Sequence, residues 1–389
     1  MNDNKIRVVM LGTRGFPNVQ GGIEKHCEHL SVNLVKLGCN VIVLTRKPYI
    51  DKKIKSFEGV RFIALPTIKN KYLETFFHTF IGIVTAFFLK PDILHVHGVG
   101  PSLFIPLARL LGLNVVMTNH GPDYQRKKWN KFAKLILRLG ESAGSRWAHE
   151  VICISEFIAN HIKEKYCRDV NVITNGMSIT EIPQTDVALR KYNLEKDKYI
   201  LAVGRLVPEK GFHDLIDAFN LFQLETQNWK LVIVGCADHD DKYSLNLKEK
   251  ASKNKDIIMT SFLGEKPLHE LYAHAGLFVL PSYYEGMPIV LFEALSHGLP
   301  CIVSNLPSTK SLQLPDDMYF VAGDVNALSQ MLKKFINKPR KWMNKNQINQ
   351  LLNKYDWYTI AIETMCIYKR ILGIKSYTEL VRRELEISN

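Results

Sequence analysis

The residue types between Glu285 and Glu293, eight positions apart, suit an anion-binding site. This segment follows an expected buried strand at 277–280. Gly286 lets the backbone approach a ligand closely, and Pro288 predicts the first position of a helix. The first N–H groups of a helix lack partners within it and, with the helix dipole, bind anions. We expect one carboxylate at the mouth of a phosphate site and the other further in, with Gly286, Met287, Pro288, Ile289 and Glu293 binding the ligand. The alternative is an ordinary strand–turn–helix unit whose glutamates face solvent.

Two cations lie earlier in the chain, in the turn between another expected strand, 199–203, and the helix that follows it. This strand ends at Gly204, and Arg205 and Lys210 precede Gly211. Arginine binds a diphosphate through paired hydrogen bonds, and lysine acts as a point charge. Because two glycines bracket the pair in a strand-to-helix turn, we interpret both residues as diphosphate ligands. Solvated surface cations are the alternative.

A glycine-rich loop joins the first expected strand to the first expected helix. Gly12 and Gly15 are present, but Asn18 stands where a third glycine would complete G-x-G-x-x-G. A dinucleotide cofactor is therefore not expected. Gly21 and Gly22 close the loop, which we interpret as a flexible segment that closes over a substrate phosphate. A purely structural loop is the alternative.

Length and composition limit the class of protein. The 389 residues predict two or three domains at roughly 150 residues each, and 46% hydrophobic residues indicate a globular protein. The formal charge of +13 implies an anionic partner: nucleic acid, a membrane surface or a phosphorylated substrate. Seven cysteines without C-x-x-C spacing suggest buried thiols in a reducing compartment. The opening residues lack the pattern of a signal peptide. The apolar stretch 76–89, being too short to span a bilayer, is interpreted as a buried helix.

Short β-rich runs alternate with helical patterns twice along the chain. Residues 1–180 and 199–356 each predict a parallel sheet covered by helices on both faces. Residues 181–198 are expected to link them, and 357–389 to form a closing helix and tail. The predicted fold class is therefore α/β, with two Rossmann-like domains facing each other. Ligands of such folds bind at the carboxyl ends of the strands, so the site is expected in a deep cleft between the domains.

The motifs resemble, in order and spacing, the retaining GT-B glycosyltransferases called family 4 or group 1. The resemblance spans nearly the whole chain. The E-x7-E motif is met at 285–293, G-R-L-x-x-E-K-G at 204–211, the N-terminal G-G loop at 21–22, and a P-N-G-like segment at 174–177. The ending at 355–360 resembles the family's helix that crosses back to the first domain. One departure is the turn at 235–241, where the family often has glycines.

The resemblance implies roles for particular residues. Arg205 and Lys210 hold the diphosphate of a nucleotide-sugar donor, and Glu293 holds its ribose. Glu285 and His120 contact the transferred sugar, and Asn175 belongs to the segment between the domains. The resemblance also implies retention of configuration, with catalysis by positioning and by electrostatic stabilisation of the leaving group. Arg205, Lys210 and Glu285 are the expected catalytic residues.

No metal or other cofactor is expected. Asp238 and Asp240 form a D-x-D pattern that binds Mn²⁺ or Mg²⁺ in another glycosyltransferase class, but loop aspartates are more often turn formers. The pairs His26/His29 and His95/His97 have spacings that suit a metal ion. Since neither pair has a third ligand in sight, we interpret both as structural.

The acceptor is expected to be a glycan or a lipid-linked glycan. Residues 125–139 hold six cations and no acid, and Trp129, Phe132, Ala133, Ile136 and Leu139 fall near one helical stripe. Such a basic amphipathic helix can lie at an anionic membrane surface; a helix packed on its own domain is the alternative. We therefore expect a cytoplasmic protein, peripheral on the inner face of the membrane, that acts in capsule, lipopolysaccharide or exopolysaccharide assembly.

Two rival functions remain open. A GT-B-fold sugar-nucleotide epimerase or hydrolase would share the donor chemistry and need no acceptor. A non-catalytic nucleic-acid-binding protein would use the positive charge, but the cations cluster in loops at strand ends and not beside aromatic platforms. Nucleic acid is therefore not expected as a partner.

Overall fold

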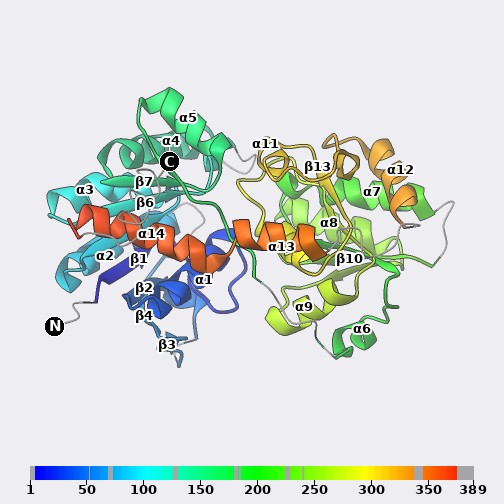
Figure 1. Ribbon diagram of the computed structural model, residues 1–389. Coiled ribbons are helices and arrows are strands. Elements are labelled where there is room, and N and C mark those ends of the chain that lie inside the picture. The colour runs from blue at the N-terminus through cyan, green and yellow to red at the C-terminus, as the bar shows by residue number, and fades with distance from the viewer. Residues whose placement is uncertain are drawn as a thin grey trace. The chain divides into compact units, whose positions relative to one another are not determined.

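The computed structural model of the protein describes residues 5–51, 53–68, 73–125, 130–178, 183, 185–223, 228–238, 241–336 and 345–374. Part of the expected basic helix (126–129), Asp240 and the tail 375–389 lie outside the described residues. The chain divides into two units, one of Met1–Asn175 with Trp357–Asn389 and one of Gly176–Asp356 (Figure 1).

The first unit contains an eight-stranded sheet in the order β3-β4-β2-β1-β5-β6-β7-β8. Its pairs are parallel except β3 with β4. The strands are β1 (Arg7–Leu11), β2 (Asn40–Arg46), β3 (Ser56–Phe57), β4 (Val60–Leu65), β5 (Ile93–His97), β6 (Val115–Asn119), β7 (Glu150–Cys153) and β8 (Asn171–Val172). The chain runs from β1 toward one edge and from β5 toward the other. Such a reversal point is where α/β sheets bind ligands.

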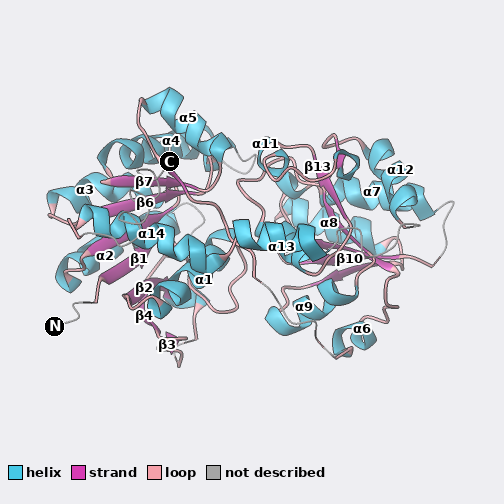
Figure 2. Ribbon diagram, viewed as in Figure 1, coloured by secondary structure: helices cyan, strands magenta, loops and turns pink. Residues whose placement is uncertain are grey.

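Helices cover both faces of this sheet (Figure 2). They are α1 (Gly22–Lys36), α2 (Leu73–Leu89), α3 (Ile105–Leu110), α4 (Lys131–Trp147), α5 (Glu156–Tyr166) and α14 (Trp357–Ile371). Ser31 of α1 donates to the sulfur of Met10, whereas Gly82 of α2 lies against Leu11. Because successive strand residues point to opposite faces, α1 and α2 lie on opposite sides of the sheet. The closing helix α14 packs on α1 and so belongs to the first unit, as the resemblance implied.

The second unit has a six-stranded parallel sheet in the order β11-β10-β9-β12-β13-β14. Its strands are β9 (Tyr199–Val203), β10 (Lys230–Val234), β11 (Ile257–Thr260), β12 (Leu277–Leu280), β13 (Cys301–Ser304) and β14 (Tyr319–Phe320). Its helices are α6 (Val187–Lys191), α7 (Phe212–Gln223), α8 (Lys242–Ser252), α9 (Glu265–His274), α10 (Ile289–Ser296), α11 (Pro307–Lys310), α12 (Val325–Phe335) and α13 (Lys345–Lys354). The strand order reverses between β9 and β12, which are neighbours.

The structure confirms the α/β fold class and departs from three details of the sequence analysis. Helix α10 begins at Ile289, and Pro288 caps it from outside instead of holding its first position. The segment expected as a linker, 181–198, contains helix α6, which packs on α9 of the second unit. The Ala188 N–H of α6 donates to the Glu270 carboxylate at 3.0 Å.

The third detail is helix α2, which is not buried as a whole, because one side of it faces solvent. A buried position was expected because the stretch is almost entirely apolar. No helix in the described residues is both long and apolar enough to cross a membrane.

Candidate functional site

The loops that follow β9 and β12 meet through one ion pair. Lys210 ends the short 3-10 helix Pro208–Lys210, and its Nζ lies 2.6 Å from Oε1 of Glu285. The Ser282 hydroxyl donates to the same oxygen at 2.6 Å. The Lys210 and Glu285 side chains are 17% and 10% exposed. The sequence predicted both residues for the site, and the fold brings them into contact at the sheet's reversal point.

A glycine allows these two loops to come this close. Gly211 has φ +66°, and a Cβ on it would collide with the carbonyl oxygen of Pro281. Next to this contact, the Tyr283 N–H donates to the Glu209 carbonyl at 2.8 Å. The backbone of the second loop therefore contacts the residues on both sides of Lys210. This rigid support is what a site that must hold charges at fixed positions requires.

Arg205 lies in the same loop and has its own acidic partner. Its Nη1 is 2.8 Å from Oδ2 of Asp238, with the two side chains 20% and 25% exposed. Asp238, which the sequence offered as half of a metal-binding motif, is therefore an ion-pair partner of the expected diphosphate ligand. A guanidinium held at a strand end by a carboxylate can still turn its remaining N–H groups toward an anion.

The glutamate inside α10 is held by a tyrosine. Oε2 of Glu293 accepts a hydrogen bond of 3.0 Å from the hydroxyl of Tyr272 on α9. Burial and the neighbouring Glu293 carboxylate raise the pKa of Tyr272 well above its usual value, so the hydroxyl keeps its proton and can donate. Met287, Pro288 and Ile289 are buried at the start of α10. Sequence reasoning missed Tyr272 and Ser282, since neither spacing nor motif connects them to the glutamates.

In the first unit, the G-G loop is braced by an ion pair. Arg14 Nε lies 3.1 Å from Oε1 of Glu24, and both side chains are largely covered. A Cβ on Gly21, which has φ +150°, would collide with Oε2 of Glu24. Burial would raise the pKa of Glu24, but the Arg14 charge and hydrogen bonds outweigh it and lower the pKa. The loop expected to close over phosphate is thus packed on its own ion pair, with exposed Gly22 starting α1.

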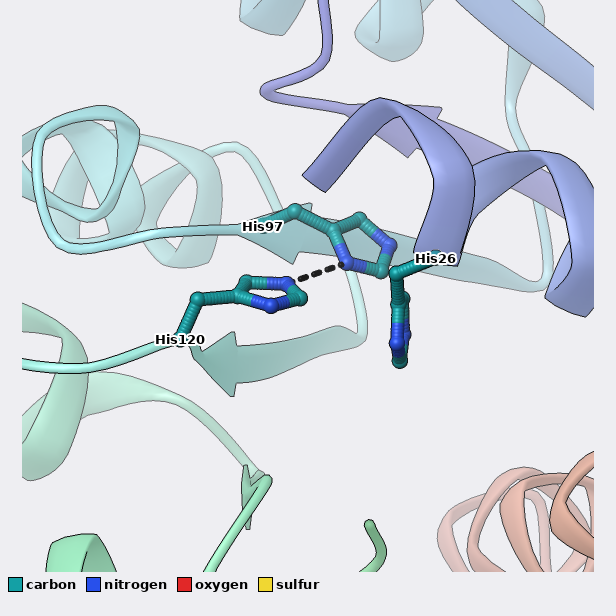
Figure 3. Close-up of side chains that lie close together, drawn as sticks. All are labelled: His26, His97 and His120. Carbon is teal, nitrogen blue, oxygen red and sulfur yellow. Dashed lines mark hydrogen bonds between the residues drawn. The ribbon is translucent and has the colours of Figure 1, made fainter. Parts of the chain in front are cut away.

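Three histidines gather at the reversal point of the first sheet (Figure 3). His26 comes from α1, His97 ends β5 and His120 follows β6; Nδ1 of His97 lies 3.3 Å from Nε2 of His120. Nδ1 of His26 lies 2.8 Å from the side-chain oxygen of Asn175, a second predicted site residue. Burial lowers the pKa of His26 to about 4 and those of His97 and His120 well below the usual value. The three rings are therefore neutral at physiological pH.

The two histidine pairs considered from sequence do not act as pairs. His29 stacks on Trp357, with ring centroids 5.0 Å apart. His95 is hydrogen-bonded to Tyr368 and Thr118, both at 2.7 Å. One member of each pair instead joins His120. Sequence reasoning missed this set because the three residues are 71 and 23 positions apart along the chain, as the numbers 26, 97 and 120 give.

The predicted site residues therefore fall into two sets. Arg205, Lys210, Glu285, Gly286, Met287, Pro288, Ile289 and Glu293 belong to the second unit, and Gly21, Gly22, His120 and Asn175 to the first. The second set follows β9 and β12, between which the strand order reverses; in the first unit, Gly21 and Gly22 follow β1, whereas His120 follows β6 and Asn175 follows β8. The individual roles remain predictions.

Comparison with known proteins identifies the family. Residues 20–181 match Glycosyltransferase Family 4, and residues 185–350 match Glycosyl transferases group 1. The chain belongs to the group 1, family 4 glycosyltransferases. This membership favours an enzyme over the nucleic-acid-binding protein considered above.

Relatives and solved structures of this glycosyltransferase cover most of its length. It is 25% identical to an uncharacterized glycosyltransferase of Methanocaldococcus jannaschii, over 94% of this chain and 98% of that protein. It is 27% identical to an Escherichia coli UDP-Gal:α-D-GlcNAc-diphosphoundecaprenol α-1,3-galactosyltransferase, over 75% and 76% of the two chains. Among solved structures, Anabaena HepE in complex with UDP and glucose superimposes with a TM-score of 0.77 at 16% identity, over 94% and 100%. The fold is that of the GT-B glycosyltransferases.

Proposed function

We propose that this glycosyltransferase moves a sugar from a nucleotide-diphosphate donor to a glycan acceptor with retention of configuration. The observation that carries the proposal is the meeting of Lys210 and Glu285 where the second sheet reverses, with Arg205 in the same loop. Two cations and the N-terminus of α10 are thus available for a diphosphate, and one carboxylate for the sugar attached to it.

The charges fit a leaving-group mechanism. When the bond between sugar and diphosphate breaks, negative charge grows on the diphosphate. Arg205, Lys210 and the free N–H groups of α10 would stabilise that charge from fixed positions. Glu285, freed from Lys210 as the lysine turns to phosphate, would orient the sugar for attack from the side that the diphosphate leaves. Because the protein supplies this charge, we propose that transfer needs no metal ion.

The nucleoside end of the donor would bind at Glu293. A carboxylate can accept hydrogen bonds from both hydroxyls of a ribose. The hydrogen bond from the Tyr272 hydroxyl fixes the orientation of the Glu293 carboxylate. HepE was crystallised with UDP and glucose, which supports a uridine nucleotide as the first donor to test.

The acceptor proposed here is a lipid-linked precursor of a cell-surface glycan. The name of the galactosyltransferase relative gives its acceptor as a sugar on diphosphoundecaprenol. A lipid-linked acceptor would place the enzyme on the cytoplasmic face of a membrane. In agreement with this, the described part of the basic segment forms the start of α4, where Lys131 and Arg138 are exposed.

A donor screen followed by product analysis tests the function. A ligand that binds only the folded protein raises its melting temperature, so UDP-, GDP- and ADP-sugars are compared by thermal shift. The best donor is then incubated with a lipid-linked acceptor, and the anomeric configuration of the product is read by NMR. An inverted product would contradict retention. Release of free sugar or an epimerised nucleotide sugar, with no transfer, would favour the epimerase or hydrolase alternative.

A further inference from the structure

Helix α2 carries its largest apolar residues on the side that faces solvent. Its inner face buries Gly82, Ile83 and Ala86 together with three polar residues, Glu74, His78 and Thr79. Glu74 lies 3.3 Å from Arg46 beneath the helix. Its outer face exposes a stripe of large apolar side chains that runs its whole length: Phe76, Phe77, Phe80, Val84, Phe87 and Phe88. Phe88 is 75% exposed. Water is a poor neighbour for such a stripe, and apolar patches of this kind mark interaction surfaces.

Helix α4 presents a second apolar stripe on the same side of the sheet. Phe132, Leu135 and Leu139 are exposed at helical spacing, and Phe132 is 69% exposed. The short 3-10 helix Pro101–Phe104 contacts both α2 and α4, and the Phe104 ring lies 4.7 Å from that of Phe76. The two stripes therefore border one continuous surface, which we call the aromatic surface.

The charges around the aromatic surface are positive. Lys131, Lys134 and Arg138 lie among the apolar residues of α4, and residues 130–140 contain no acid. Lys90 follows α2 and is exposed, while the one acid in α2 is buried against Arg46. Exposed phenylalanines flanked by lysine and arginine fit acyl chains beneath anionic headgroups.

We propose that the aromatic surface inserts into the boundary between headgroups and acyl chains of the leaflet that it faces, in an anionic bilayer, and holds the enzyme there. This deepens the proposed function, on which it rests for the lipid-linked acceptor, but insertion is independent of sugar transfer. It also differs from attachment by charge alone. The phenylalanines should give binding that persists at a salt concentration that screens the lysines.

Flotation of the full chain with vesicles tests the proposal. Vesicles of phosphatidylcholine with and without phosphatidylglycerol are compared at 0.1 and 0.5 M NaCl. The double variant Phe80→Ser/Phe88→Ser should lower the partition coefficient roughly tenfold or more, and at high salt it should abolish binding. The matched control Phe262→Ser, at another exposed phenylalanine in the second unit, should bind like the parent chain. The melting temperature and its rise with the best nucleotide-sugar donor, measured without membrane, should be unchanged in both variants.

Several results would overturn insertion. These are a parent chain that binds neither vesicle, a double variant that binds as the parent does, or a soluble dimer that the double variant dissociates. The last would assign the surface to a second copy of the chain. Loss of sugar transfer with normal vesicle binding would instead count against the proposed function and leave insertion standing.

A second inference rests on the three histidines, independently of the membrane surface. One nitrogen from each of His26, His97 and His120 lies within 4.8 Å of the other two. Nε2 of His26 is buried and, within the described residues, has no hydrogen-bond partner. The side-chain oxygen of Asn175 accepts a hydrogen bond from Nδ1–H of His26. Nε2 of His26 therefore carries the lone pair, and it lies on the side of the ring away from Asn175. An amide oxygen on the far nitrogen is the support that metal-bound histidines usually have.

We infer that His26, His97 and His120 form a Zn²⁺ site with an open fourth position. In a tetrahedral site with Zn–N of about 2.0–2.1 Å, neighbouring nitrogens are about 3.3–3.4 Å apart. The distance of 3.3 Å between Nδ1 of His97 and Nε2 of His120 matches this value. The three ligand nitrogens lie within 4.8 Å of one another, so one ring must turn to bring all of them to the tetrahedral spacing. Because His120 is also the expected sugar contact, bound Zn²⁺ should inhibit transfer. That consequence rests on the proposed function, whereas the binding does not.

Metal titration of the purified full chain tests this site. Zn²⁺ is titrated against a coloured chelator, and Co²⁺ is followed by its visible absorbance. The chain should bind one equivalent, His26→Gln or His97→Gln should weaken binding at least tenfold, and Asn175→Ala should weaken it about 10–100-fold. The matched control His29→Gln, on the same helix but stacked on Trp357, should bind normally. Absence of binding by the parent chain, or unchanged binding by His97→Gln, would overturn the site. Zn²⁺ inhibition that is equal in the parent and His97→Gln would overturn the link to transfer.

Discussion

Replacing Lys210 by methionine separates the role of its charge from the role of its chain. Methionine keeps much of the length and apolar stem but cannot hold a diphosphate. If Lys210 stabilises the departing diphosphate, the effect appears in kcat, because only stabilisation that grows in the transition state raises turnover. The expected loss in kcat is on the order of 10²–10³-fold, about 2.7–4 kcal/mol, as for the removal of one fixed donor from an oxyanion site. The change in KM for the donor should be smaller.

The structure also sets the cost in stability. Removing one partner of a fully buried ion pair costs about 3–5 kcal/mol. The Lys210–Glu285 pair retains 17% and 10% exposure, so Glu285 can be partly rehydrated. We expect a loss nearer 1–3 kcal/mol. A domain of ordinary stability stays folded after such a loss, so reduced folding would not account for the fall in kcat.

The assay measures initial rates and urea unfolding of the same preparations. The control is Lys253→Met, which breaks another ion pair of the second unit, Lys253 with Glu249 at 3.1 Å, at the C-terminal end of α8. Lys253→Met should leave kcat unchanged. Turnover at the parent rate in Lys210→Met, with sugar transfer verified, would show that the leaving group is stabilised elsewhere. Combining Lys210→Met with Arg205→Ala should cost less than the sum of the two if they act as a unit.

Four further predictions follow from the structure. Glu293→Gln should weaken donor binding by about 1.5–3 kcal/mol, measured by calorimetry, and unchanged affinity in a folded variant would refute the ribose contact. Gly211→Ala should lower the free energy of unfolding by about 2–4 kcal/mol, because its Cβ meets the Pro281 carbonyl. Gly373→Ala, with nearly the same φ but open space around it, should lose clearly less in the same urea titration. Saturating EDTA should leave transfer nearly intact, and a loss restored by Mg²⁺ or Mn²⁺ would make a metal essential. Burial would raise the pKa of Asp92, but its hydrogen bonds and ion pair with Arg7 outweigh burial and lower the pKa. The Arg7–Asp92 pair therefore stabilises the fold fully above the unfolded pKa of about 3.9. This stabilisation is lost as the pH falls through the lower pKa that Asp92 has in the folded protein. Asp92→Asn should flatten this part of the acid-unfolding curve, and an identical curve would contradict the pairing.

Much of the second unit could be predicted from the sequence. The strands Tyr199–Val203 and Leu277–Leu280 are continuous apolar runs bounded by turn residues, which is typical of buried parallel strands. The loops after them carry the cations and the glutamates in short motifs. Because parallel strands present their carboxyl ends on one edge, the sequence also indicated that these motifs would be neighbours. The strand order, which makes β9 and β12 neighbours, could not be predicted from the sequence.

Other features depended on contacts between distant residues. Tyr272 holds Glu293 only because α9 packs beside α10, and a tyrosine 21 positions away carries no pattern that reveals this. The basic stripe of α4 was visible in the sequence, but its exposed apolar residues are Phe132, Leu135 and Leu139, and neither Ala133 nor Ile136 is fully exposed.

The sequence by itself determined which segments form strands and helices and which loops carry charge, because periodicity and turn residues act locally. It could not decide which side of a helix faces the sheet when nearly every residue is apolar. In α2, the buried side is set by Arg46 and the close approach of Gly82 to Leu11, so the phenylalanines are left outside. Nor could it bring together His26, His97 and His120, which come from three separate elements. Only the reversal of strand order at β1 and β5 places those elements side by side, and burial then keeps their rings neutral.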